Sequence, residues 1–260
     1  MKKITSKNAA FTFQLCLSLA VSIIGKAQDA GRADLAADSL KAFTQQVQQA
    51  YAKAAYLSFK VKYLYANGGQ PGKYIDSLLG EVQMNAGRSR IIIDSIETVL
   101  TGRYAIHIVK EDKLIYLGAP ARGAGENPVG MLDSAFVHIK GISTHLYHNA
   151  GAHILILDFP PGQAYTRMEI SIDDRTGFFQ RIAYSINTLG FVGRDMIESP
   201  GHTAPYESKG RVVILFSDYK KGAFDDRVFK EDNFFTRTAG RYEPAGQYKD
   251  YRIYLASSNL

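Results

Sequence analysis

Four histidines fall within a short stretch of the chain and are the side chains best suited to bind a metal ion. They are His138, His145, His148 and His153, and imidazole nitrogen is a common metal ligand in proteins. Their spacing matches neither an HExxH motif nor a paired HxH motif, and no carboxylate ligand set accompanies them along the sequence. We therefore predict that these histidines are solvated or paired across a hairpin and that the protein holds no metal.

Other residues that could serve in catalysis or in phosphate binding have simpler structural explanations. Asp173 and Asp174 form a pair of carboxylates, but they open the turn at residues 173–177, where aspartate side chains accept backbone hydrogen bonds. The glycine-rich segment 118–125 lacks the GxxxxGK[ST] order of a phosphate-binding loop, and the chain contains no GxSxG nucleophile elbow. The sequence thus predicts no catalytic residue, no cofactor and no enzyme.

The first 27 residues have the three parts of a secretory signal peptide in the expected order. Lysines within residues 2–7 precede a mostly apolar run over residues 9–24, and small residues follow at 25 and 27. The run is short and interrupted by polar residues, which favours a cleaved signal over a membrane anchor. We expect cleavage near Ala27, a periplasmic location and a mature chain that is not integral to the membrane.

Charge and cysteine content exclude several classes of function. Removal of the signal peptide takes away four lysines and no acid, so the formal net charge falls from +6 to +2, with 27 basic residues against 25 acidic ones. Such a balance supplies no phosphate-neutralising surface, and we predict no nucleic-acid partner. The single cysteine lies in the apolar run of the signal, which excludes disulfides and thiol catalysis from the mature chain.

The mature chain begins with a predicted helix that runs into a predicted strand. Over residues 38–55, apolar side chains recur at spacings of three and four, which is the period of an amphipathic helix. This stripe consists of Leu40, Phe43, Val47, Tyr51 and Ala54. From Leu57 to Tyr65 the apolar residues alternate with polar ones, as in a strand with one buried face.

Further strand-like segments follow at short intervals, which favours an antiparallel sheet. They cover residues 74–85, 88–95, 103–110, 113–117, 153–159, 165–173, 178–187 and 211–219. Turns at 110–113 and 173–177 predict two hairpins, the second with Gly177 in the left-handed conformation. Asn127-Pro128 opens a predicted short helix that reaches Phe136. We expect one mainly β (α+β) domain over residues 28–260.

Alternation along these strands predicts one strongly apolar sheet face. An ordinary core would use such a face, whereas a curved sheet incompletely filled by helices would use it to line a cavity for an apolar ligand. We predict the second use. The predicted cavity-lining residues are Phe59, Val61, Tyr63, Val82, Met84, Ile91, Ile93, Ile106, Ile108, Leu155, Leu157, Met168 and Ile170.

The order of these segments resembles the LolA/LolB-type periplasmic lipoprotein carriers over most of residues 38–255. The matching stretches are Ala55-Tyr56-Leu57-Ser58-Phe59 after the helix, Gly80-Glu81-Val82-Gln83-Met84 with Arg88 and Arg90 before Ile91, residues 106–117, Asn127-Pro128 through Leu132, and the hairpin from Met168 to Tyr184. The resemblance implies a strongly curved, incomplete antiparallel β-barrel, or half-barrel. An N-terminal helix and a short lid helix would cover it, and its apolar interior would receive acyl chains.

The sequence also departs from the pattern of these carriers. Asp112 is not followed by glycine, Gly87-Arg88-Ser89-Arg90 replaces the usual Arg-Pro pair, and tryptophan is absent. The resemblance implies that Arg88 corresponds to the arginine that holds the lid closed in these carriers. Residues 234–254, which include Phe234, Phe235 and four tyrosines, extend past the usual end of the family and predict an added strand or a tail that covers a sheet edge.

These observations leave three classes of function open. The first is an exported carrier or binding protein whose partner is a lipid or an acylated lipoprotein, and the sequence favours it. The second is a non-catalytic envelope interaction or assembly protein on the same fold, with an envelope protein as its partner. The third is a hydrolytic or metal enzyme, which a stoichiometric metal at the histidines would favour.

Overall fold

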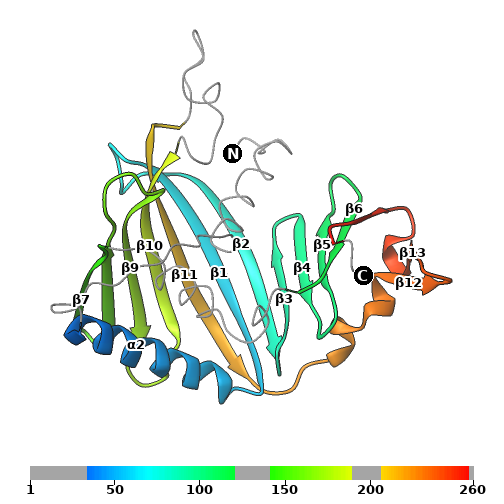
Figure 1. Ribbon diagram of the computed structural model, residues 1–260, viewed down its shortest axis with the longest axis horizontal. Coiled ribbons are helices and arrows are strands. Elements are labelled where there is room, and N and C mark those ends of the chain that lie inside the picture. Colours follow the sequence, from blue (N-terminus) through cyan, green and yellow to red (C-terminus); the bar gives the residue numbers. More distant parts are fainter. Residues whose placement is uncertain (1–33, 121–140, 189–205, 258–260) are drawn as a thin grey trace, which may run out of the picture.

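The computed structural model describes residues 34–120, 141–188 and 206–257, which form one helix and a large open sheet (Figure 1). The predicted signal peptide and the predicted short helix at 128–136 lie outside the described residues. The helix is α2 (Asp34–Ala52). It begins four residues before the predicted start and ends three residues before the predicted end, so Ala54 of the predicted stripe lies outside it. Phe43, Val47 and Tyr51 of the stripe are buried, each at most 4% exposed.

Twelve strands of the described residues form a single sheet that does not close into a barrel. Their order is β14-β6-β5-β4-β3-β2-β1-β11-β10-β9-β8-β7, and all neighbours are antiparallel except the parallel pair of β14 and β6. The strands are β1 (Tyr56–Asn67), β2 (Tyr74–Asn85), β3 (Arg88–Ile93), β4 (Ile96–Leu100), β5 (Ala105–Val109), β6 (Leu114–Gly118), β7 (Ser143–Asn149), β8 (Ala152–Asp158), β9 (Tyr165–Asp173), β10 (Phe179–Asn187), β11 (Lys209–Lys221) and β14 (Arg252–Leu255). The sheet is strongly curved (Figure 1), and the predicted fold class, an incomplete antiparallel β-barrel with an N-terminal helix, is confirmed.

Two strands of this sheet were not predicted. β4 follows β3 after a two-residue turn in which Asp94 has a φ of 51°, so the sequence over 88–100 contains two short strands where one was expected. β7 is the edge strand, and nearly all its side chains are exposed. A strand without a buried face shows no alternation of apolar and polar residues, which explains why the pattern missed it.

The predicted hairpins at 110–113 and 173–177 are confirmed. In the second, the Gly177 backbone N–H donates to the carbonyl of Asp173 at 2.8 Å, and Gly177 has a φ of +70°. The Asp173 carboxylate accepts from the backbone N–H groups of Arg175 and Thr176, as the turn interpretation requires. Asp174 behaves differently, because its side chain points to two histidines.

The two faces of the sheet are covered by different parts of the chain. We call the face that packs against α2 the helix face, and the other the outer face. On the helix face, residues of α2, β1 and β8–β11 form the larger core, which includes Val47, Phe59 and Leu157.

On the outer face, the C-terminal segment packs over β4, β5 and β6. It comprises three short 3-10 helices, a hairpin and β14. The 3-10 helices are η3 (Asp226–Phe229), η4 (Glu231–Asn233) and η5 (Gly246–Tyr248), and the hairpin consists of β12 (Phe235–Thr238) and β13 (Arg241–Pro244). Phe229, Phe234, Phe235 and Tyr248 form a second core there with fully buried side chains of the sheet. Because β14 pairs with β6, the segment also covers a sheet edge, and the prediction of an added, edge-covering strand is confirmed.

Candidate ligand-binding face

The structure brings eleven of the thirteen predicted cavity residues together on the helix face. Cross-strand pairs of a sheet share a face, and the pairs Phe59 with Val82 and Val82 with Ile91 link β1, β2 and β3. The seven that are buried in the larger core are Phe59, Val61, Val82, Leu155, Leu157, Met168 and Ile170. Four keep partial exposure, namely Tyr63, Met84, Ile91 and Ile93. The open part of the helix face therefore starts at β2 and β3.

Ile106 and Ile108 do not belong to this face, and their assignment to the predicted cavity is wrong. Ile91 pairs with Thr98 and Thr98 pairs with His107, so His107 shares the helix face with Ile91. Neighbouring residues of a strand point to opposite faces, which places Ile106 and Ile108 on the outer face. Both are fully buried there in the second core.

Arg88 also lies on the outer face, and its predicted role as a lid contact is corrected. It pairs with Asn85 at the start of β3, on the face opposite to Met84. Its guanidinium donates to Asp226 Oδ2 at 3.0 Å and lies 4.9 Å from the centre of the Phe229 ring. Arg88 thus holds the C-terminal segment, which the family pattern does not include.

A second group of residues on the helix face was missed, because β4 was not predicted and the faces of β5 were therefore assigned the wrong way round. They lie on β4, β5 and β6, where the register continues the face of Ile91 and Ile93. The apolar members with half-buried side chains are Leu100, Val109 and Leu114. On the outer face of the same strands, the apolar residues are fully buried against the C-terminal segment, including Val99, Ile106, Ile115 and Leu117.

His107 is the one histidine of the described residues that lies within this half-buried region. Its Nδ1 is 3.1 Å from Thr98 Oγ1, its partner across β4 and β5. Burial lowers the pKa of His107, because removal from water disfavours the imidazolium. The imidazole is therefore neutral at pH 7, and the helix face over β3–β6 carries no charge at this position.

An aromatic pocket of about 340 Å³ opens at the end of the helix face, beside the C-terminal turn of α2. A volume of this size lies within the range of about 300–1,000 Å³ typical of small-molecule sites. Half of its lining is aromatic, with Phe178, Phe179, Phe216 and Tyr219 joined by Asp173, Thr176, Gln180 and Lys221. Tyr219 also stacks on Phe59 at 4.9 Å between ring centres, so the pocket adjoins the cross-strand row Phe59, Val82 and Ile91.

The polar atoms of this pocket wall satisfy one another. Tyr219 donates its hydroxyl proton to the Phe179 carbonyl at 2.9 Å, so at the 2.9 Å contact with Tyr51 the Tyr51 hydroxyl is the donor. The Phe179 N–H donates in turn to the Tyr51 oxygen at 3.4 Å. Burial raises the pKa of both phenols, which stay protonated. The rings therefore present an apolar surface to the pocket.

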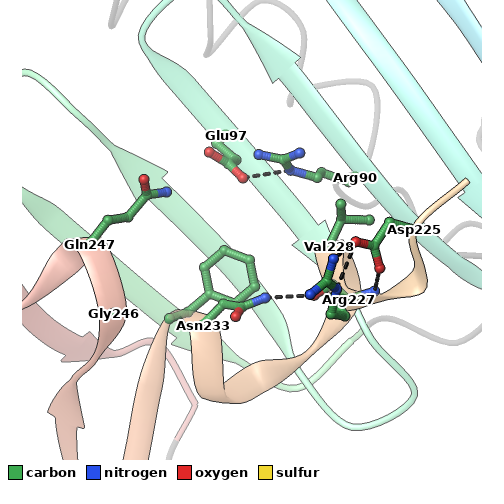
Figure 2. A pocket seen from close by; sticks show the side chains of 9 residues that line it. Arg90, Glu97, Asp225, Arg227, Val228, Asn233, Gly246 and Gln247 are labelled. Atoms are coloured by element: carbon green, nitrogen blue, oxygen red, sulfur yellow. Dashed lines mark hydrogen bonds and ion pairs between the residues drawn. The ribbon is translucent and has the colours of Figure 1, made fainter.

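A second pocket, of about 430 Å³, lies on the outer face between β3, β4 and the C-terminal segment (Figure 2). Its charged side chains are already paired. Arg90 Nε donates to Glu97 Oε1 at 2.7 Å, and Arg227 binds Asp225 through Nε at 2.7 Å. This pocket offers no uncompensated charge to a ligand from its lining, and the aromatic pocket is the better candidate for an apolar molecule.

The structure brings two of the four predicted histidines together and places a third one apart from them. His138 lies outside the described residues, and His145 contacts Ser143 on the exposed edge strand. His148 and His153 face each other across β7 and β8, and both contact the Asp174 carboxylate. The expectation that no carboxylate accompanies the histidines is therefore wrong. Asp174 is distant from them in sequence, and only the pairing of β8 with β9 brings it close.

No protein-family model matches the sequence, and no curated protein matches it. Among solved structures, the chain is similar to an uncharacterised conserved protein from Thermus thermophilus, with 11% identity, a TM-score of 0.47 and coverage of 84% of this chain and 99% of the other. A LolA superfamily protein from Nitrosomonas europaea shows 10% identity, a TM-score of 0.32 and coverage of 75% and 98%.

The lipoprotein LppX of Mycobacterium tuberculosis is similar at 12% identity, with a TM-score of 0.40 and coverage of 73% of this chain and 99% of the other. Within the described residues, no helix is long and apolar enough to span a membrane.

Proposed function

We propose that this protein is an exported, non-catalytic carrier or binding protein for a lipid or an acylated lipoprotein, and that it acts in the periplasm as one domain over residues 28–260. The observation that carries the proposal is the unequal covering of strands β4–β6. Their outer face is sealed by the C-terminal segment, with Ile106 and Ile108 at 0% exposure. Their helix face keeps half-buried apolar side chains at Leu100, Val109 and Leu114, and Ile91 and Ile93 of the neighbouring β3 extend this apolar surface.

The register aligns helix-face side chains of six neighbouring strands in one row. One cross-strand row runs from Phe59 through Val82, Ile91, Thr98 and His107 to Tyr116. Five strand spacings of about 4.8 Å give this row a length of roughly 24 Å. Phe59 and Val82 are buried in the larger core, so the open part of the row runs from Ile91 to Tyr116, over three strand spacings or roughly 14 Å. Such a surface can hold part of an acyl chain. Each methylene transferred from water to such a surface contributes about 0.8 kcal/mol.

A pair of neighbouring substitutions tests the proposal. Ile93 lies on the helix face above Gly80 and close to Val61, whereas Ile92 lies on the outer face between Glu81 and Glu97. Lysine is suited to both positions, because at Ile92 it meets two carboxylates while at Ile93 it meets apolar groups. We expect Ile93→Lys to weaken binding of a fluorescent hexadecanoic acid at least about tenfold, and Ile92→Lys to leave it unchanged, because an unpaired charge among apolar groups is costly.

Binding would be measured by fluorescence titration of the mature protein, with circular dichroism to establish that each variant is folded. Equal weakening by the two lysine variants would contradict a site on the helix face. The absence of binding to the wild type would contradict the carrier function itself.

A second candidate function, non-catalytic interaction or assembly in the envelope, is favoured by the edge strand β7. Its backbone forms the end of the sheet in the described residues, and Leu146 and Tyr147 are 43% and 44% exposed. Such an edge can accept a strand from a partner protein. Two results together would support this function: the wild-type protein binds no fatty acid, and Tyr147→Pro abolishes the binding of its partner protein.

A further inference from the structure

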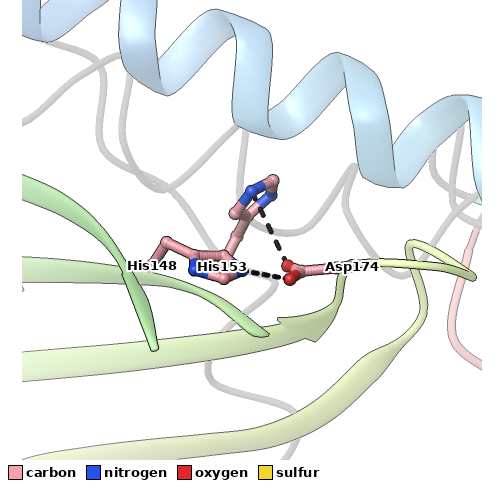
Figure 3. A group of neighbouring side chains, drawn as sticks. All are labelled: His148, His153 and Asp174. Atoms are coloured by element: carbon pink, nitrogen blue, oxygen red, sulfur yellow. Dashed lines mark hydrogen bonds and ion pairs between the residues drawn. The ribbon is translucent and has the colours of Figure 1, made fainter. Parts of the chain in front are cut away.

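We propose that His148, His153 and Asp174 form a binding site for a divalent transition metal, with Zn²⁺ as the ion that fits best. The three side chains come from β7, β8 and the β9–β10 turn, and they converge at the hairpin ends below α2 (Figure 3). One ligand atom from each lies within 4.8 Å of the other two. Two imidazoles and one carboxylate are a ligand set that Zn²⁺ uses, with the remaining position open to water.

One of the two imidazole–carboxylate contacts has the spacing of groups that share a metal ion. The other, between His148 and Asp174, is a direct contact, so the exposed His148 ring would move outward to admit the ion. His153 Nε2 lies 3.6 Å from Asp174 Oδ1, too far for a hydrogen bond. Ligand atoms about 2.0–2.2 Å from a tetrahedral zinc lie roughly 3.3–3.6 Å apart, which agrees with this separation. His148 Nε2 contacts the other carboxylate oxygen, Oδ2, so the carboxylate lies between the two rings.

A buried oxygen without a partner is the second observation that points to a ligand. Asp174 Oδ1 is inaccessible to solvent, and no donor among the described residues forms a hydrogen bond to it. A buried carboxylate oxygen left in this way is costly, and a cation would satisfy it. The Asp174 backbone is fixed at the same time, because its N–H donates to the Gly151 carbonyl of the β7–β8 turn at 3.1 Å.

A hydrogen bond to Gln46 of α2 orients the His153 ring and places a proton on its Nδ1. His153 Nδ1 lies 3.2 Å from Gln46 Oε1, and an amide oxygen only accepts, so Nδ1 carries the proton. In the neutral ring, Nε2 then directs its lone pair at Asp174 Oδ1, and two acceptors face each other. A metal ion between them resolves this arrangement, and the Gln46 contact is the outer hydrogen bond that metal-binding histidines usually make.

The site would join three elements that are separate in the sequence. The metal would bridge the β7–β8 hairpin and the β9–β10 turn directly, and Gln46 would extend the connection to α2. Both His148 and His153 keep partial solvent exposure, with side chains 58% and 38% exposed, so an ion can enter from solution. The site lies on the α2 side of the sheet, away from β3–β6, and its occupancy does not depend on the proposed apolar ligand.

Zn²⁺ competition with a chromophoric chelator tests this proposal on the mature protein without an affinity tag. We expect one zinc per chain, and at least about tenfold weaker binding in His148→Ala, His153→Ala and Asp174→Asn. Gln46→Ala should weaken binding by about tenfold, as loss of an outer hydrogen bond does. His145→Ala is the matched control, because His145 lies on the same strand and contacts Ser143.

Two results would overturn the proposal. One is binding of zinc by Asp174→Asn with wild-type affinity, or an equal loss in His145→Ala, since either would show scattered surface binding. The other comes from thermal unfolding with ZnCl2 or with EDTA. An Asp174→Asn midpoint that falls below the wild type by the same amount in both conditions would show that the cluster is only an ion pair.

Discussion

Glu97 shows how far one residue of this chain depends on partners from distant segments. Its side chain is 0% exposed on the outer face of β4, yet it is held as a carboxylate. Arg90 and Lys110 bind it at 2.7 and 3.2 Å, and the Tyr248 hydroxyl donates to Oε2 at 3.1 Å. Burial alone would raise the pKa of Glu97, but the hydrogen bond and charge of Arg90, with those of Lys110, lower it below its ordinary value.

Substitution of Glu97 by glutamine should therefore destabilise the protein. The amide keeps the volume of the side chain but leaves Arg90 and Lys110 without their negative partner. Arg90 and Lys110 are both partly exposed, so they recover some hydration. We expect the free energy of unfolding at pH 7 to fall by about 1–3 kcal/mol, measured by urea denaturation. Glu81→Gln is the control, because Glu81 is exposed on the same face. A similar loss in both variants would contradict the role assigned to burial.

The pH dependence of this difference has a defined sign. The pKa of Glu97 is lower in the folded protein than its ordinary value of 4.5, so the unfolded state takes up the proton first as pH falls. The contribution of Glu97 is fully present above about pH 4.5 and is lost as pH falls through the lowered folded value. The wild-type and Glu97→Gln proteins should therefore converge in stability below pH 4.5.

At the scale of elements, the position of α2 depends on a close approach to the β9–β10 turn. Gly177 has a positive φ, and a Cβ on it would lie 2.8 Å from the Ala50 Cβ of α2. Gly151 in the β7–β8 turn has a similar φ of +78°, but no atom lies within 4 Å of its missing Cβ. A comparison of alanine substitutions at the two glycines therefore distinguishes the cost of backbone strain from the cost of displacing the helix.

Alanine at each position measures these two contributions. Gly151→Ala should cost about 1–2 kcal/mol, the strain of a left-handed alanine. Gly177→Ala should cost about 1–3 kcal/mol more, because α2 must shift away from the turn. Chemical denaturation gives both values, and the near-ultraviolet circular dichroism of Tyr51 and its neighbours should change only in Gly177→Ala. Equal costs would show that α2 approaches the turn less closely.

At the scale of the whole molecule, the C-terminal segment acts as the second layer of the sheet. It buries Val99, Ile106, Ile108, Ile115 and Leu117 completely. At about 1.5–3 kcal/mol for each buried side chain, these five account for roughly 10 kcal/mol, which is comparable with the net stability of a typical domain. The C-terminal segment is therefore part of the core of this protein.

Removal of residues 223–260 should expose that outer face. We expect strong binding of the dye ANS and association on size-exclusion chromatography, since a large apolar patch on a sheet promotes aggregation. Removal of residues 256–260 alone should have neither effect, because the elements of the second core are retained. A shorter chain that stays monomeric and binds no more ANS than the wild type would contradict the structural role of the segment.

The sequence alone determined the elements with strong periodicity. The helix stripe at Phe43, Val47 and Tyr51, the long strands β1 and β2, and the two turn-marked hairpins follow from local patterns, because a side chain's direction within one element is set by its backbone period. Within β3, this reasoning also placed Ile92 and Ile93 on opposite faces. The resemblance to the lipoprotein carriers gave the half-barrel, which the register of the sheet confirms.

Only the tertiary structure decided how faces and side chains of different strands meet. Alternation relates residues within one strand, but the turn between two strands sets which face comes next, and the unpredicted strand β4 put Ile106 and Ile108 opposite to Ile91 and Ile93. The meeting of Asp174 with His148 and His153 has the same origin, since strand pairing joins residues that no sequence spacing relates. Long-range register is a property of the packed sheet and leaves no local signal in the chain.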